Sequence, residues 1–287
     1  PMIDYPSSVP RVERWGKRVR HAVQWLGLAL RAGGVPPAVV VHPDAPSRRT
    51  ALYKMCRALG VELTNRPRRR VLLTMRFEDA TEKAAQRPAW WPAGAWNDRC
   101  DDIRKSTLER AHAQVFGYGV AVDPRAHTGR MLEKGDGNAV HDGREVVGPV
   151  DAPALGKVYQ IIVNNRSADG RAVDLRLVFI RGQFPAVYLK YKPEDARYTN
   201  LTTSVELGSV EARFTPSELV SVNALMAALH VDYAELDVLR DADSGRMYGV
   251  DVNPTPWGPP AGLPAAASSE AVSAMAAALQ SAAVSSK

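Results

Sequence analysis

Residues 231–254 read VDYAELDVLRDADSGRMYGVDVNP, and the interpretation of the whole chain starts from them. Two strand-forming runs flank residues 241–245, Asp-Ala-Asp-Ser-Gly, which are residue types that turns favour. The stretch therefore predicts an antiparallel hairpin in which Arg240 pairs with Arg246 across the turn.

That register gathers acidic side chains on one face of the hairpin. It sets Glu235 opposite Asp251, with Asp237 on the diagonal. Because side chains alternate along a strand, Asp237, Asp251 and Asn253 project from the same face. Facing carboxylates destabilise a hairpin unless a proton or a cation lies between them, and Mg²⁺ typically takes one or two protein carboxylates. We predict a magnesium site here; the alternative is a solvated acidic edge beside an ordinary turn.

A second strand pair is predicted over residues 172–192, AVDLRLVFIRGQFPAVYLKYK. A three-residue loop sets Asp174 opposite Lys190 and places Arg176, Lys190 and Lys192 on a shared surface, whereas a two-residue loop reverses that outcome. Cations beside a metal hairpin suit a triphosphate, because Arg and Lys can clamp a phosphoryl group. Taken alone, this segment is equally compatible with an exposed sheet that carries ordinary ion pairs.

Residues 131–138, MLEKGDGN, form a third candidate site. Lys134 ends an apolar run, and the glycines after it allow backbone N–H groups to approach a phosphate closely, although Gly-Asp-Gly-Asn is also an ordinary turn. The sequence contains no GxxxxGK[ST], no GxGxxG after a strand, no GxSxG and no HExxH. These absences argue against a P-loop, a dinucleotide-binding fingerprint, a serine hydrolase elbow and a zincin.

Composition narrows the class of protein further. The 287 residues are 45% hydrophobic and 24% charged, which is typical of a folded chain of about two domains. The net charge of +6 divides unevenly: twenty basic and ten acidic residues precede or include Lys105, and seventeen basic and twenty-one acidic residues follow it. The basic part predicts an anionic partner. Two cysteines and no apolar run of about 18 residues favour a cytoplasmic protein without a membrane span.

Hydrophobic periodicity predicts an N-terminal alternation of strands and helices, a linker at 88–96, and a later part dominated by strands. The expected helices are 12–31, 47–59, 101–116, 216–229 and 265–283. The expected strands are 38–42, 61–63, 70–75, 157–163, 172–180, 184–191, 232–240 and 246–253. We interpret residues 129–148 as a glycine-rich stretch without strands.

These parts, in this order, resemble the ATP-grasp superfamily, and within it the ribosomal-protein glutamate ligases and related carboxylate–amine ligases. The likeness covers roughly residues 97–256. Its most specific part is ELDVL at 235–239 followed by DVNPTP at 251–256, which is similar to the family's magnesium signature. By that resemblance Asp237, Asp251 and Asn253 would hold two Mg²⁺ ions against ATP.

The resemblance also implies roles for residues outside the hairpin. Asp174-Leu175-Arg176 is similar to the family's D-x-R strand, and AVYLK at 186–190 followed by Asn200 is similar to its A-A-x-x-R … N pair, with Lys in place of Arg. Arg176 and Lys190 would then be catalytic. The nucleotide would be bound by Lys105, Lys134, Gly135, Gly137, Gln160, Ile161, Ile162 and Asn200. No Pro follows Lys134, which departs from the family's pattern.

The implied fold class is α/β (α+β) of the ATP-grasp type. A small N-terminal α/β domain (1–97) would precede a central ATP-binding subdomain (98–163) and a C-terminal subdomain (164–287), and the last two would sandwich ATP. The N-terminal domain would help to select the acceptor or the donor, and its basic charge predicts an anionic co-substrate.

The implied activity is that of an ATP- and Mg²⁺-dependent ligase. It would phosphorylate a carboxylate to an acyl phosphate, which an amine attacks to give an amide; both substrates would be small molecules or peptides. One alternative is a small-molecule kinase on the same scaffold. Another is a basic nucleic-acid-binding protein that uses residues 66–70 with Trp90, Trp91 and Trp96, which we weigh lower because arginine clusters are usually solvated and grouped tryptophans usually pack. The oligomeric state stays open.

Overall fold

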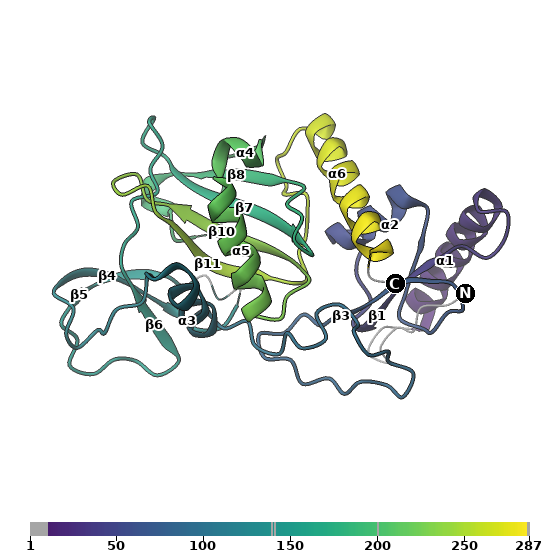
Figure 1. The fold of residues 1–287 in the computed structure, drawn as a ribbon, viewed down its shortest axis with the longest axis horizontal. Helices are drawn as coiled ribbons and strands as arrows, with labels where there is room; N and C mark the ends of the chain where they lie inside the picture. Colours follow the sequence, from purple (N-terminus) through teal and green to yellow (C-terminus); the bar gives the residue numbers. More distant parts are fainter. Residues whose placement is uncertain (1–10, 139, 141, 200, 286–287) are drawn as a thin grey trace.

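The computed structural model contains three β-sheets joined by helices (Figure 1). It describes residues 11–138, 140, 142–199 and 201–285. Within these ranges, no helix is both long enough and apolar enough to cross a membrane.

The N-terminal sheet is parallel, with strand order β2-β1-β3. Its elements are α1 (Arg11–Arg31), β1 (Ala38–Pro43), α2 (Ala51–Leu59), β2 (Glu62–Thr64) and β3 (Val71–Phe77). Helix α2 begins where the Thr50 hydroxyl accepts a hydrogen bond from the Tyr53 N–H at 3.3 Å, and it ends at Gly60, whose φ of 67° suits glycine. The predicted alternation of strands and helices is confirmed.

Helix α1 is present as predicted, but its apolar stripe is not covered. Val23, Leu26 and Leu30 are 56–76% exposed, whereas Leu28 is buried. The helix therefore turns a different set of side chains toward the protein than its periodicity predicts.

The largest sheet is antiparallel, with order β11-β10-β7-β8-β9. Its strands are β7 (Ala172–Ile180), β8 (Val187–Lys192), β9 (Ser204–Gly208), β10 (Tyr233–Arg240) and β11 (Met247–Asn253). The short η1 (Glu194–Ala196) and α4 (Val210–Arg213) lie in its connections, and α5 (Pro216–Ala228) packs on one face over Leu175, Leu177 and Phe179.

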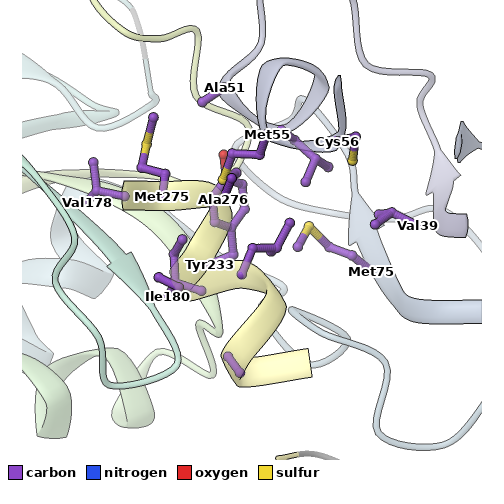
Figure 2. Packing of buried hydrophobic residues seen from close by; sticks show 14 of the residues in the cluster. Val39, Ala51, Met55, Cys56, Met75, Val178, Ile180, Tyr233, Met275 and Ala276 are labelled. Carbon is purple, nitrogen blue, oxygen red and sulfur yellow. The ribbon is translucent and has the colours of Figure 1, made fainter. Parts of the chain in front are cut away.

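The opposite face of this sheet is divided along the strands. At one end, Val178, Ile180 and Tyr233 pack against α6 (Ala265–Val284). Figure 2 shows this layer, with α6 between the sheet residues and the N-terminal residues Met55 and Met75. One hydrophobic core therefore joins the N-terminal sheet to the large sheet, and the other end of the sheet face is left for polar side chains.

The third sheet corrects the interpretation of the glycine-rich stretch. Strands β4 (Gly129–Gly135), β5 (Arg144–Gly148) and β6 (Lys157–Gln160) form an antiparallel sheet of order β5-β4-β6 beside α3 (Lys105–Phe116). Strand β6 was predicted, whereas β4 and β5 were missed because they carry many charges, which the fold pairs across the sheet: the Arg144 guanidinium donates to Glu133 at 2.7 Å. Strand β6 also ends at Gln160, earlier than the predicted residue 163.

The predicted register of the β10–β11 hairpin is wrong by two residues. Arg240 pairs with Met247 rather than Arg246, and the register shifts again between Asp237 and Val238. The first difference comes from a longer turn, and the second from a bulge that adds one residue to β11. As a result, Asp237 lies directly opposite Asp251.

The predicted register of β7 and β8 is confirmed, with Asp174 opposite Lys190. The turn itself has two residues, because Ile180 and Gln183 exchange backbone hydrogen bonds of 2.9 Å around Arg181 and Gly182. An additional residue then precedes Ala186, whose carbonyl accepts from the Val178 N–H, and this restores the expected pairing.

Candidate functional site

A cavity of about 560 Å³ is lined by side chains from the polar end of the large sheet and from the small sheet. Its residues come from α3, from β4 and β6 with the segment after it, and from β7, β8, β10 and β11. Ten predicted site residues line it: Lys105, Lys134, Gln160, Ile161, Ile162, Arg176, Lys190, Asp237, Asp251 and Asn253.

Two predicted residues of the described part of the chain, Gly135 and Gly137, do not line the cavity. Asn200 lies outside the described residues. Gly135 donates its N–H to Asp142 at 2.7 Å, and the Gly137 carbonyl accepts a hydrogen bond from the Lys105 ammonium. The glycines therefore bind the protein itself, and the loop they form is tied to the first turn of α3, where Asp136 accepts from the Ser106 N–H at 2.8 Å.

The pKa values of two carboxylates at one end of the cavity are shifted in opposite directions. Burial works to raise the pKa of Asp237, but Arg176, which donates two hydrogen bonds of 2.7 and 2.8 Å, outweighs burial and holds the pKa well below its usual range. Burial, together with the charge of Asp237, raises the pKa of Asp251 to about 6. Its Oδ1 is buried without a hydrogen bond, and the nearest cation is the Lys105 ammonium at 3.8 Å.

These donors fit a hard divalent cation. Asp237 and Asp251 are direct cross-strand neighbours, Asn253 lines the same cavity, and the buried Asp251 Oδ1 has no hydrogen bond, its one ion-pair contact being Lys105 at 3.8 Å among the described residues. Among the described residues, no group of three or more His, Cys, Asp or Glu could hold a metal. An ion here would therefore depend on the Asn253 amide oxygen and on oxygens from a ligand or water.

The cavity also contains positive charge that the protein does not neutralise. Within the described residues, the ammonium groups of Lys134 and Lys190 have neither a hydrogen bond nor an ion pair. Burial, and then the neighbouring Lys105, lower the pKa of Lys134 to about 8, and burial also lowers the pKa of Lys190. Lys192 differs, because it forms an ion pair of 2.6 Å with Asp174. Two desolvated cations without partners suit a polyanion.

The remaining end of the cavity is apolar and has one open stretch of backbone. Its side chains are Val120, Leu132, Ile161, Val163, Leu239 and Val250. The Ile161 N–H donates to the Val120 carbonyl at 2.8 Å, whereas neither backbone group of Ile162 has a protein partner among the described residues. A flat heteroaromatic ring with one donor and one acceptor on its edge would satisfy both groups.

Three lining residues were not among the predicted site residues. Asp79 follows β3, whereas Thr255 and Trp257 follow β11. Asp79 lines the same cavity as the other two although more than 170 residues of the chain separate it from them. The Thr255 hydroxyl lies 3.2 Å from Asp79 Oδ1. Only the folded chain brings such residues together, so a pattern within one segment could not have indicated Asp79.

The residues proposed for nucleic-acid binding are largely engaged in the fold. Arg68 donates to the buried Glu62 at 2.7 and 2.9 Å, and Trp96 is 2% exposed. The Trp91 indole donates to Asp98 at 2.8 Å. This part of the chain therefore offers few free groups for a nucleic acid.

Comparisons with known proteins place this geometry in a fold family. No family model and no curated protein sequence matches the chain. Among solved structures, one of the ATP-grasp ligase PsnB, complexed with a phosphomimetic variant of its minimal precursor, Mg and ADP, superposes with a TM-score of 0.55. It is 12% identical, over 86% of this chain and 97% of that one. The chain has the ATP-grasp fold.

A second PsnB structure, complexed with the minimal precursor, gives a TM-score of 0.50 at 14% identity, over 77% of this chain and 91% of that one. The fold class that the resemblance implies is therefore confirmed. The closer likeness to ribosomal-protein glutamate ligases and the individual roles of the site residues stay predictions. Within the ATP-grasp fold of this chain, the cavity described above is where those residues meet.

Proposed function

We propose that the protein is an ATP- and Mg²⁺-dependent ligase that joins a carboxylate to an amine through an acyl phosphate. The observation that carries the proposal is the charge pattern of one cavity: two lysines without a partner among the described residues, and one buried carboxylate oxygen without a hydrogen bond. Mg and ADP are bound in a PsnB structure of the same fold, which supports this choice of cofactors.

The nucleotide would lie along the cavity from its apolar end to its charged end. The adenine edge would pair with the free backbone of Ile162, next to Gln160 and Ile161, between the apolar side chains. The phosphates would reach Lys134 and Lys190, whose ammonium groups then gain the negative partners that they lack, and Lys105, which already contacts Asp251 and the Gly137 carbonyl.

The metal ligands would be Asp237, Asp251 and Asn253. When bound, Mg²⁺, with two ions proposed, neutralises charge that develops on the transferring phosphoryl group. Arg176, which holds Asp237 and lies 3.5 Å from Glu235, adds a fixed positive charge at the same end. Together with Lys190 it would stabilise the phosphoryl group as a catalytic cation.

The bond changes need no nucleophile from the protein, and the cavity is lined by no serine or cysteine among the described residues. A substrate carboxylate oxygen would attack the γ-phosphorus, and ADP would leave. An amine nitrogen would then attack the acyl carbon, so that a C–N bond forms, the C–O bond to phosphate breaks, and inorganic phosphate and a proton are released. Positioning and electrostatics carry such a reaction.

The proposal is tested by an ADP-release screen of carboxylates paired with amines, together with thermal unfolding in Mg-ATP. We expect Mg-ATP to raise the Tm of the protein, and Asp251→Ala to remove that shift. We also expect free phosphate when a carboxylate and an amine are both present. Phosphate that stays on a stable hydroxyl product would identify the kinase alternative, and the lack of any Tm shift in wild type would refute nucleotide binding.

A further inference from the structure

A second cavity, of about 670 Å³, lies in the N-terminal part of the chain. Helix α1 contributes Trp25 and Leu28, α2 contributes Tyr53 and Arg57, and β3 contributes Phe77. Most of its wall is apolar, which differs from the charged cavity described above. Its volume is in the range of pockets that enclose a small molecule.

The two cavities share a boundary. Asp79, Thr255 and Trp257 line both of them. The Thr255 hydroxyl lies 3.2 Å from Asp79 Oδ1 and 3.2 Å from the side-chain oxygen of Asn253, a proposed metal ligand. A molecule in the second cavity can therefore present one end to the place where the phosphates and the metal would lie.

The end of the second cavity at this boundary is negatively charged. Asp79 and Asp44 both line it, and the Asp79 N–H donates to Asp44 Oδ2 at 2.8 Å. Within the described residues, neither carboxylate forms an ion pair. Two carboxylates without a counter-ion repel a substrate carboxylate and attract an ammonium group.

A positive charge lies further along the same cavity. The Ala51 N–H donates to the Pro256 carbonyl at 3.0 Å, so the first turn of α2 is beside the boundary. Arg57 is six residues further along α2, which corresponds to about 9 Å at the helical rise. Its guanidinium has no hydrogen bond or ion pair among the described residues, and Arg48 on the same cavity also has none. Glu62 also lines the cavity, but its carboxylate is paired with Arg68 at 2.7 Å.

We propose that the second cavity binds the amine substrate, and that this substrate is an apolar amino acid or a residue of that kind with a free amino group and a carboxylate. The ammonium would lie at Asp79, the apolar side chain against Leu28 and Phe77, and the carboxylate at Arg57. This inference rests on the proposed function, because the amine is the second substrate of that ligase. The amino-acid carboxylate would be the anionic group that the basic charge of the N-terminal part predicts.

The test uses the intrinsic fluorescence of the full-length protein, because Trp25 and Trp257 line the cavity. The probes are L-phenylalanine, L-leucine and L-methionine, titrated without nucleotide. L-phenylalaninamide lacks the carboxylate, and 3-phenylpropionate lacks the amine. We expect at least one of the three amino acids to bind, and each trimmed analogue of phenylalanine to bind roughly tenfold more weakly than phenylalanine.

Two variants and a control test which side chain of the cavity binds the carboxylate and which binds the ammonium of the amino acid. Arg57→Gln is expected to weaken amino-acid binding roughly tenfold and to remove the preference over the amide, and Asp79→Asn to remove the preference over 3-phenylpropionate. Arg69→Gln changes an exposed arginine that lines neither cavity, and it should leave binding unchanged. Binding of none of the three amino acids, or equal binding by wild type and Arg57→Gln, would overturn the inference.

The outcome is separable from that of the proposed function. Amino-acid binding is measured without ATP, and the Mg-ATP thermal shift is measured without an amino acid. Failure of the first with a normal shift refutes the substrate class alone. Loss of the shift in wild type refutes the nucleotide site, whatever the fluorescence shows.

Discussion

The two cavities of this protein use charge in different ways. In the first, positive and negative side chains are crowded together, and several of them lack the partner that burial demands: Lys134, Lys190 and Asp251. In the second, most of the wall is apolar, and Asp44, Asp79 and Arg57 have no ion pair among the described residues. The first arrangement suits a highly charged ligand, whereas the second suits a ligand with an apolar part and separate charged groups.

The largest effect is expected from removing the Asp251 carboxylate, which has a buried oxygen without a hydrogen bond in the first cavity. Asp251→Ala should raise the Kd for Mg-ATP by roughly 100-fold or more, because a metal ligand is lost. Isothermal titration measures the Kd, with Asp243→Ala as control: Asp243 lies in the turn of the same hairpin, outside the cavity, and accepts from Asn164. An equal loss of Mg-ATP affinity in the two variants would show that a disturbed hairpin, and not the missing Asp251 carboxylate, is responsible.

Replacing an unpaired and a paired lysine of the first cavity should have opposite effects on stability. Lys134→Met should weaken Mg-ATP binding roughly 10- to 100-fold and leave the nucleotide-free protein as stable or more stable, since a desolvated charge is removed. Lys192→Met leaves Asp174 without its ion pair and should destabilise the protein. Chemical denaturation without nucleotide measures both. A destabilised Lys134→Met would contradict the assignment.

The pH dependence of nucleotide binding should follow the same lysine. Free Lys134 has a pKa of about 8, and a bound polyanion raises that pKa. Affinity is therefore constant from about pH 7 to about pH 8 and falls by about tenfold per pH unit between the free and the bound pKa values. Lys134→Arg keeps its charge over this range, so titrations from pH 7 to 9.5 should show a flatter profile for that variant.

Filling the second cavity should weaken binding of the amino-acid probe and leave Mg-ATP binding nearly unchanged. Leu28→Trp places a larger side chain on its apolar wall and should weaken binding of the amino-acid probe by roughly tenfold. Mg-ATP binding should stay within about twofold, since Leu28 does not line the first cavity. A joint loss of both would mean that the two cavities are not independent.

The smallest expected effect concerns the boundary that the two cavities share. Thr255→Val removes the hydroxyl between Asp79 and Asn253, and it should lower kcat/KM for the amine by roughly fivefold, the equivalent of about 1 kcal/mol. Steady-state ADP release measures it. Thr203→Val, which removes a hydroxyl bonded to the Tyr191 carbonyl outside both cavities, is the control.

Much of the lining of the first cavity could be predicted because strands impose alternation. Once residues 172–192 and 231–254 are read as strands, the faces that carry Arg176, Lys190, Asp237, Asp251 and Asn253 follow from a period of two. The register of β10 and β11 did not follow, because a bulge and a longer turn have no distinct signal in residues 235–253. Strands β4 and β5 were not predicted because charged residues, which pair with each other in the sheet, interrupt their apolar pattern.

Local patterns thus identified most of the strands and the acidic and basic residues that meet in the first cavity, because those patterns arise from backbone geometry within single segments. The fold class came from the resemblance of the ordered motifs to a known family. The local patterns did not reveal which charges lack a partner, that Asp79 meets Thr255, or that a second cavity adjoins the first. These properties depend on desolvation and on contacts between distant segments, and both exist only when the N-terminal sheet, α6 and the large sheet pack into one core.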